Sequence, residues 1–166
     1  HFYDCDRGIS HQIISELIRP GMLVAGSDSH TATAGAFNTL AVGINKTETA
    51  VLWKTGKMWF QVPETMKIVL KNRLSEGAFA KDLALWIKGI LSELDVNGQA
   101  IEYHGEGVSS LSIDDRMTIA NISTEMGVVS SAFPPDDRLA DYFNEPAVRG
   151  VWADEEAVYS RFIEID

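Results

Sequence analysis

Cysteine is almost absent from this sequence, which has Cys5 alone among its 166 residues. A single cysteine excludes a disulfide within the chain and is compatible with a reducing cytoplasm, where we expect the protein to work. Apolar runs are short as well. None approaches the roughly 20 residues that a helix needs to span a bilayer, and no basic segment followed by an apolar one marks a signal peptide. Membrane partners are therefore not expected.

Positive charge is also scarce, with 14 Lys and Arg residues against 24 Asp and Glu residues and a formal net charge of -10. An acidic surface repels a polyanion, so we expect no nucleic acid partner; solubility is a sufficient explanation of the acidity. The excess of acids lies entirely in residues 64–166, because residues 1–63 carry five acids and five bases. Together with Pro63, this shift predicts two structural units, 1–63 and 64–166.

Helical and extended patterns alternate along the chain. Helices are predicted at 11–18 behind the cap Ser10, at 33–42, 47–55, 80–94 and 112–127, and strands at 22–26, 66–70, 100–104 and 161–165. Short apolar strands separated by amphipathic helices are typical of parallel sheets covered by helices. The fold class is therefore predicted as α/β, in layered α/β/α units with a mostly parallel sheet.

Three polar side chains in succession follow the apolar strand 22–26. Asp28, Ser29 and His30 stand there, before a run of small residues that lets backbone or ligand come close. Ligands of open α/β sheets collect outside the carboxyl ends of strands, so these side chains are candidates for catalysis. Asp and Ser are also common helix caps, but capping does not require the histidine.

A second pair of candidates lies on the helix predicted at 112–127. Ser112 can cap this helix and Gly127 can end it. Asn121 and Glu125 are four residues apart and therefore share one face, opposite an apolar face. Such a polar face is ordinarily solvated, and the pattern alone leaves that alternative open.

Six separated groups of residues form a recognisable set. They are 8–12 (GISHQ), 26–31 (GSDSHT), 55–65 (TGKMWFQVPET), 105–108 (GEGV), 116–121 (RMTIAN) followed by 125–127 (EMG), and 163–166 (IEID). In their order and spacing they resemble the aconitase superfamily, and within it the large subunits of 3-isopropylmalate dehydratase and homoaconitase. The resemblance covers essentially the whole chain, and six motifs in register are far more specific than one.

This resemblance implies a hydro-lyase that dehydrates and rehydrates hydroxy di- or tricarboxylic acids and so moves a hydroxyl to the neighbouring carbon. The family uses a [4Fe-4S] cluster, held by three cysteines, as the Lewis acid. The branch resembled here implies 3-isopropylmalate as the substrate, in leucine biosynthesis, with homocitrate or citrate as alternatives. It also implies a protein partner, a separate small subunit that carries the mobile swivel domain.

The resemblance assigns roles to six residues. It implies catalytic roles for His11, Asp28, His30 and Glu125, and substrate binding for Ser29 and Asn121. In the family the active-site histidines pair with carboxylates, which implies that His30 approaches Glu125 and that His11 approaches Asp28. A protonated imidazole beside a carboxylate is a tunable acid, which suits the protonation of a departing hydroxide.

Two parts of the family's machinery are missing from these 166 residues. The family's cluster cysteines lie downstream of the segment matched here, and Cys5 matches none of them, so we expect no cofactor or metal in this chain by itself. The serine that acts as the base lies on the swivel domain. With His1 in place of an initial Met, this implies an internal piece of a longer enzyme, comprising the end of the first aconitase-type domain (1–63) and the second (64–166).

Three alternatives stay open. Ser29 and His30 could serve a hydrolase, although neighbouring residues rarely direct their side chains at each other and the stretch is not a Gly-x-Ser-x-Gly elbow. His11, Asp28 and His30 could bind a single metal ion such as zinc. The chain by itself could also be a catalytically inactive interaction module.

Overall fold

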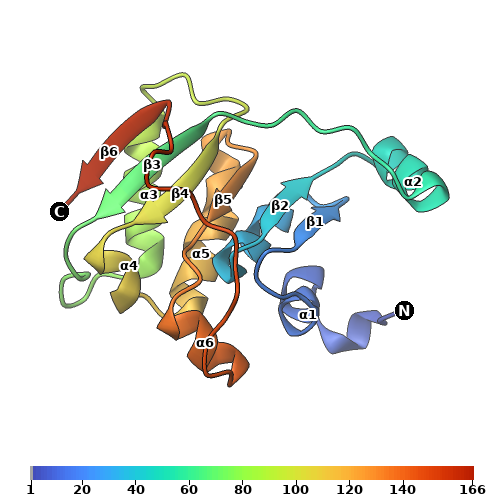
Figure 1. The fold of residues 1–166 in the computed structure, drawn as a ribbon, viewed down its shortest axis with the longest axis horizontal. Helices are drawn as coiled ribbons and strands as arrows, with labels where there is room; N and C mark the ends of the chain where they lie inside the picture. The colour runs from blue at the N-terminus through green and yellow to red at the C-terminus, as the bar shows by residue number, and fades with distance from the viewer. Residues whose placement is uncertain (1) are drawn as a thin grey trace.

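The computed structural model describes residues 2–166, so His1 lies outside the described residues. The chain forms two parallel sheets with helices around them (Figure 1). The elements are η1 (Cys5–Arg7), α1 (Ser10–Leu17), β1 (Leu23–Gly26), η2 (Ser29–Phe37), β2 (Leu40–Gly43), α2 (Lys46–Thr55), β3 (Thr65–Leu70), α3 (Ala80–Leu91), β4 (Ala100–His104), α4 (Glu106–Ser110), α5 (Ile113–Ser123), η3 (Thr124–Met126), β5 (Ser130–Ala132), α6 (Asp137–Phe143) and β6 (Arg161–Ile165). The predicted α/β class with parallel strands is confirmed. Within residues 2–166, no helix combines the length and apolarity needed to cross a membrane.

The smaller sheet consists of β1 and β2, joined by the 3-10 segment η2. The two strands run parallel, with Leu23 opposite Leu40 and Gly26 opposite Gly43. The prediction of one helix over 33–42 is therefore wrong. Asn38 adopts a left-handed conformation (φ 56, ψ 49) that ends η2, and the chain then enters β2. A four-residue apolar run fits either a helix or a strand, and here only its pairing with β1 decides.

The larger sheet has the strand order β5-β4-β3-β6, and every pairing in it is parallel. Met66 and Ile68 of β3 lie opposite Ile101 and Tyr103 of β4 and are fully buried with them. Helices α3 and α5 cover this apolar face, while the irregular segment 144–160 crosses the other (Figure 1). The layering thus has helices on one face of this sheet, where the alternate residues of β3 and β4 are buried and apolar, whereas Lys67, Glu102 and Glu164 lie on the other face.

The two sheets lie next to each other and share a buried contact. The backbone N–H of Ala41 in β2 donates to the Ser130 hydroxyl in β5 at 3.3 Å. Segment η2 lies directly on β5, since a Cβ atom at Gly35 would stand only 1.6 Å from the backbone oxygen of Ser131. The strands of the smaller sheet all precede residue 63 in the sequence, and those of the larger sheet all follow it. The division into two domains at this residue stays a prediction.

Helix α5 is the element that connects the two parts. Ser112 caps it as predicted, in a capping box with Asp115, and Gly127 follows in a left-handed conformation (φ 84). After Ser123 the helix tightens into η3, so Glu125 does not continue the regular α-helical face of Asn121. The predicted cap at the first helix is wrong, because the N-cap of α1 is Ile9 and makes no side-chain hydrogen bond.

Candidate functional site

The turn between β1 and η2 holds the polar triplet at the carboxyl end of β1. Asp28 is the N-cap of η2, and its Oδ1 accepts a hydrogen bond from the backbone N–H of His30 at 2.7 Å. Thr31 Oγ1 donates to the backbone oxygen of Asp28 at 2.6 Å. A Cβ atom at Gly43 would come within 3.1 Å of that oxygen, so β2 must end in a small residue to leave room for the turn. Asp28 therefore caps the segment and orients His30 at the same time.

The His30 ring has a polar neighbour at each nitrogen. Nδ1 lies 3.2 Å from Ser29 Oγ and 3.7 Å from Asp28 Oδ1, and Nε2 lies 3.4 Å from Oε1 of Glu125. The expectation that Ser29 and His30 do not face each other is therefore wrong. His30 has non-helical backbone angles (φ -86, ψ 16) inside η2, and this kink lets the two neighbouring side chains meet.

His11 reaches the same place from α1. Its Nε2 lies 3.4 Å from Asp28 Oδ1, and its ring centroid lies 6.2 Å from that of His30. Its side chain is 17% exposed, against 33% for His30 and 53% for Asp28. Asp28 Oδ1 thus lies within 3.7 Å of both imidazole rings.

Glu125 and Asn121 enter the site from the other side, through η3 and α5. Glu125 faces His30, whereas the Asn121 amide donates to Thr33 Oγ1 of η2 at 2.9 Å. Thr124 Oγ1 donates to the backbone oxygen of Ser29 at 3.0 Å. Thr33 and Thr124 were not predicted from the sequence, because nothing in a single sequence marks a threonine as a link between distant segments.

The six predicted residues thus fall into one cluster, in which acids and imidazoles alternate. His11, Asp28, His30 and Glu125 form a row of three contacts, each between 3.4 and 3.7 Å. Imidazole is the side chain most often used as a general acid or base, because it can gain or lose a proton near neutral pH. The row can therefore hold a proton on an imidazole and deliver it to a bound molecule. Ser29 contacts the row directly at His30 Nδ1, and Asn121 is joined to it through Thr33, whose hydroxyl donates to the backbone oxygen of His30.

The same cluster does not have the arrangement of a metal site. Over residues 2–166, no group of three or more His, Cys, Asp or Glu side chains is placed so that it could hold a metal ion. His11 Nε2 and His30 Nδ1 instead each lie beside Asp28 Oδ1, at 3.4 and 3.7 Å. The alternative of a mononuclear metal ion held by these three residues is therefore not supported.

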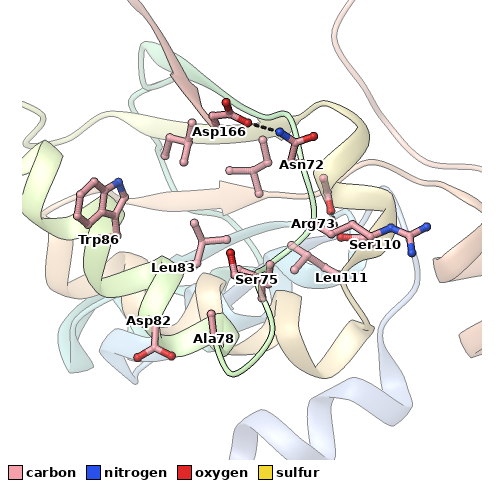
Figure 2. Close-up of a pocket in the computed structure, with 14 residues that line it drawn as sticks. Asn72, Arg73, Ser75, Ala78, Asp82, Leu83, Trp86, Ser110, Leu111 and Asp166 are labelled. Atoms are coloured by element: carbon pink, nitrogen blue, oxygen red, sulfur yellow. Dashed lines mark hydrogen bonds between the residues drawn. The ribbon is translucent and has the colours of Figure 1, made fainter.

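A hollow in the surface lies at the carboxyl ends of β3 and β6, where the strand order of the larger sheet reverses. It measures about 380 Å³ and is walled mainly by apolar side chains such as Leu83 and Leu111. Figure 2 shows Arg73 and Asp82 on opposite sides of this hollow, while Asn72 and Asp166 are hydrogen-bonded to each other. Such a reversal point is where ligands of open sheets commonly bind, but none of the six predicted residues lies there.

A polar cluster also lies on the helix-free face of the larger sheet. Tyr159 donates to Oε2 of Glu102 at 2.8 Å, and Nε2 of His104 lies 3.2 Å from the same oxygen. Burial by itself raises the pKa of Glu102, but the hydrogen bonds from His104 and Tyr159 outweigh it and hold that pKa below its usual value. Burial, together with the hydrogen bond to Glu102, raises the pKa of Tyr159 to about 12. This cluster fastens the segment 144–160 to the sheet.

Comparison with known proteins matches the whole chain to one family. A model of the aconitase family (aconitate hydratase) matches residues 1–166. The chain is 40% identical to 3-isopropylmalate dehydratase large subunit 1 of Methanopyrus kandleri, over all of this chain and 41% of that protein. It is 37% identical to the probable methanogen homoaconitase large subunit of Methanosarcina mazei, over 96% of this chain and 42% of that protein.

A fungal relative is similar over a smaller share of its length. The mitochondrial homoaconitase of Cryptococcus neoformans is 43% identical over 86% of this chain and 20% of its own length. The chain therefore spans about two fifths of the large-subunit relatives and one fifth of the fungal protein.

Proposed function

Because the chain belongs to the aconitase family, we propose that the complete protein is a hydro-lyase that moves a hydroxyl between adjacent carbons of a hydroxy di- or tricarboxylic acid. The substrate we propose is 3-isopropylmalate, in leucine biosynthesis, since relatives bearing that name align with the whole chain. Homocitrate or citrate is the alternative, because homoaconitases of similar identity align as well.

The observation that carries this proposal is the row of imidazole and carboxylate groups. A hydroxyl leaves carbon far more readily if it takes up a proton, and a positioned histidine can donate one. In our proposal the protonated His30 donates from the nitrogen that faces Glu125, and the carboxylate stabilises the charged ring until the transfer. His11 and Asp28 form the second pair, which holds or returns the proton during rehydration.

Ser29 and Asn121 are proposed to bind the substrate rather than to move protons. The Ser29 hydroxyl lies at the rim of the cluster and can donate to a substrate carboxylate. Asn121 keeps its carbonyl oxygen available, because its amide nitrogen is the group that donates to Thr33. These roles are compatible with a substrate that carries two or three carboxylates and a hydroxyl.

The residues present do not fit a [4Fe-4S] cluster as its ligands. Clusters of this type need about three or four thiolates, whereas the chain has one cysteine. We propose that the complete protein holds its cluster through cysteines outside these 166 residues, and we assign no step to the cluster. A small swivel-domain subunit is proposed as the partner, since the relatives are named as large subunits.

The test is an assay of the complete protein together with a small subunit, on 3-isopropylmalate, homocitrate and citrate in parallel. Formation of the unsaturated acid, followed by ultraviolet absorbance and by NMR, is expected for 3-isopropylmalate. The variant His30→Gln is expected to lose activity about 10²- to 10⁴-fold, the usual contribution of a general acid, while its thermal unfolding stays unchanged. Turnover of none of the three acids would overturn the proposal, and turnover of homocitrate or citrate alone would favour the alternative.

A further inference from the structure

Glu125 is exposed, yet its carboxylate stands in a defined place beside His30. The side chain is 55% exposed, and within the described part of the chain two side chains approach its oxygens. His30 Nε2 lies 3.4 Å from Oε1, and Lys88 Nζ lies 4.0 Å from Oε2. One oxygen therefore faces the imidazole and the other faces an ammonium group, so each carboxylate oxygen has a basic neighbour.

Lys88 is brought there by the packing of α3. Its neighbour Ile87 is 1% exposed and Leu91, one turn later, is also 1% exposed, so this end of α3 is anchored in the core. Lys88 itself is 42% exposed and projects from the same end toward η3. A lysine in the last turn of a helix also interacts favourably with the helix dipole, and this is the simpler explanation that a test must separate.

We propose that Lys88 is a positioning residue for the hydro-lyase reaction: it holds the far oxygen of Glu125 so that the near oxygen faces His30. This inference rests on the proposed function. The ammonium also balances one negative charge in a site that carries Asp28 and Glu125 and that must admit an anionic substrate. Lys88 acts through Glu125 and does not contact the substrate.

The charged and titratable groups around this row come from four elements. Asp28 and His30 belong to the turn into η2, His11 belongs to α1, Glu125 belongs to η3 and Lys88 belongs to α3. Acids and bases alternate from His11 to Lys88, and Lys88 is the residue that ends the row with a permanent positive charge. Among the described residues, removing it leaves Glu125 with the ion pair to His30.

A double-mutant cycle in the complete protein, assayed with its small subunit, tests this role. We expect Lys88→Met to lower kcat about three- to fivefold, the range of a half-exposed ion pair, with KM unchanged. In a Glu125→Gln background the same substitution is expected to have no further effect, because Lys88 acts through the carboxylate. Lys88→Arg is expected to keep most of the activity. Lys81→Met, on an exposed lysine of the same helix, is the matched control and is expected to match the parent.

Several outcomes overturn the proposal. An equal loss of kcat in the Glu125→Gln background shows that Lys88 acts independently of Glu125, and an increase in KM alone shows that it binds substrate. No effect of Lys88→Met leaves only the helix dipole as the role of Lys88.

Urea unfolding separates this proposal from the proposed function. It is measured on the parent, on Lys88→Met, on Glu125→Gln and on the double variant. Coupling between the two substitutions, about two- to fivefold in the unfolding constant, supports the Lys88–Glu125 contact even if the parent turns over none of the tested acids. That result would overturn the proposed function and leave the contact supported. Additive unfolding effects overturn the contact itself.

Discussion

His30 and Glu125 lie 3.4 Å apart, Nε2 to Oε1, although one belongs to the turn after β1 and the other to η3 at the end of α5. The contact exists because α5 packs across η2, tied there by the hydrogen bonds of Asn121 to Thr33 and of Thr124 to Ser29. The row from His11 to Glu125 is therefore a property of the interface between the two sheets and their helices, and it depends on that interface staying closed.

Replacement of Glu125 tests whether this contact serves chemistry. Glu125→Gln keeps the size of the side chain but removes the negative charge 3.4 Å from His30 Nε2. We expect kcat of the complete enzyme to fall about 10²- to 10⁴-fold, with only a small decrease in melting temperature because Glu125 is 55% exposed and its ion pairs contribute little to stability. Steady-state kinetics and thermal unfolding measure the two effects. A variant with full activity would leave Glu125 as a solvated surface acid.

The 166-residue chain by itself is expected neither to bind a [4Fe-4S] cluster nor to catalyse dehydration. A cluster of this type needs about three or four thiolates, and the chain offers one cysteine. The measurement is anaerobic reconstitution of the isolated chain, followed by iron and sulfide analysis and visible absorbance. Stoichiometric iron and sulfide with the absorbance of a cluster would contradict this prediction.

Gly35 is expected to be essential for the docking of η2 on β5. A Cβ atom there would lie 1.6 Å from the backbone oxygen of Ser131, so Gly35→Ala must push the two segments apart. We expect a loss of about 1 to 3 kcal/mol in the free energy of unfolding, as for other overpacked sites, measured by urea denaturation. Gly89→Ala is the control, because beyond the backbone of its own helix and its two chain neighbours nothing lies within 4 Å of its Cβ position on α3. The control is expected to stabilise the chain slightly, and equal effects of both variants would be inconsistent with the close approach.

Arg116 and Asp136 form an ion pair whose cation is completely buried. The guanidinium is 0% exposed, donates to Asp136 Oδ1 at 2.9 Å and also bonds the backbone oxygen of Val108 at 3.2 Å. Asp136→Ala leaves this charge without its partner, so we expect a loss of about 3 kcal/mol in the free energy of unfolding. Asp137→Ala, on the exposed neighbouring acid, is expected to cost far less. Similar losses in the two variants, compared by chemical denaturation, would argue against the buried pair.

The hydrogen-bonded pair of Tyr159 and Glu102 is expected to make the free energy of unfolding depend on pH in both acid and alkaline solution. The pKa of Glu102 is lowered on folding, so its contribution is present above the usual pKa of a carboxyl and is lost as the pH falls through the lowered value. The pKa of Tyr159 is raised to about 12. Its contribution to stability is therefore present below about pH 10, the usual pKa of a tyrosine, and is lost as the pH rises from there through the raised value.

Tyr159→Phe removes the hydrogen bond to Glu102 while keeping the ring. We expect a loss of about 1 kcal/mol in the free energy of unfolding near neutral pH and a flatter decline in alkaline solution. Urea unfolding at several pH values measures both. A parent and a variant with parallel pH profiles would show that the hydrogen bond contributes nothing to stability.

Several elements could be predicted from the sequence because their signals are local. Strands β4 and β6 have the predicted bounds, and the capping residue Ser112 and the terminator Gly127 mark α5 through short-range backbone chemistry. The position of the triplet Asp28, Ser29 and His30 behind a strand also follows from the apolar run before it, and its meaning came from a resemblance in six motifs.

Other features were decided only by tertiary structure. Strand β2 forms because residues 40–43 pair with β1. The same four apolar residues are equally compatible with a helix. Lys88 entered the site through the packing of α3 against η3, at a distance in sequence that no local pattern spans. Local propensity depends on residues that are close together in the sequence. A parallel strand pairing or a contact between two helices depends on groups that the chain brings together only when it folds.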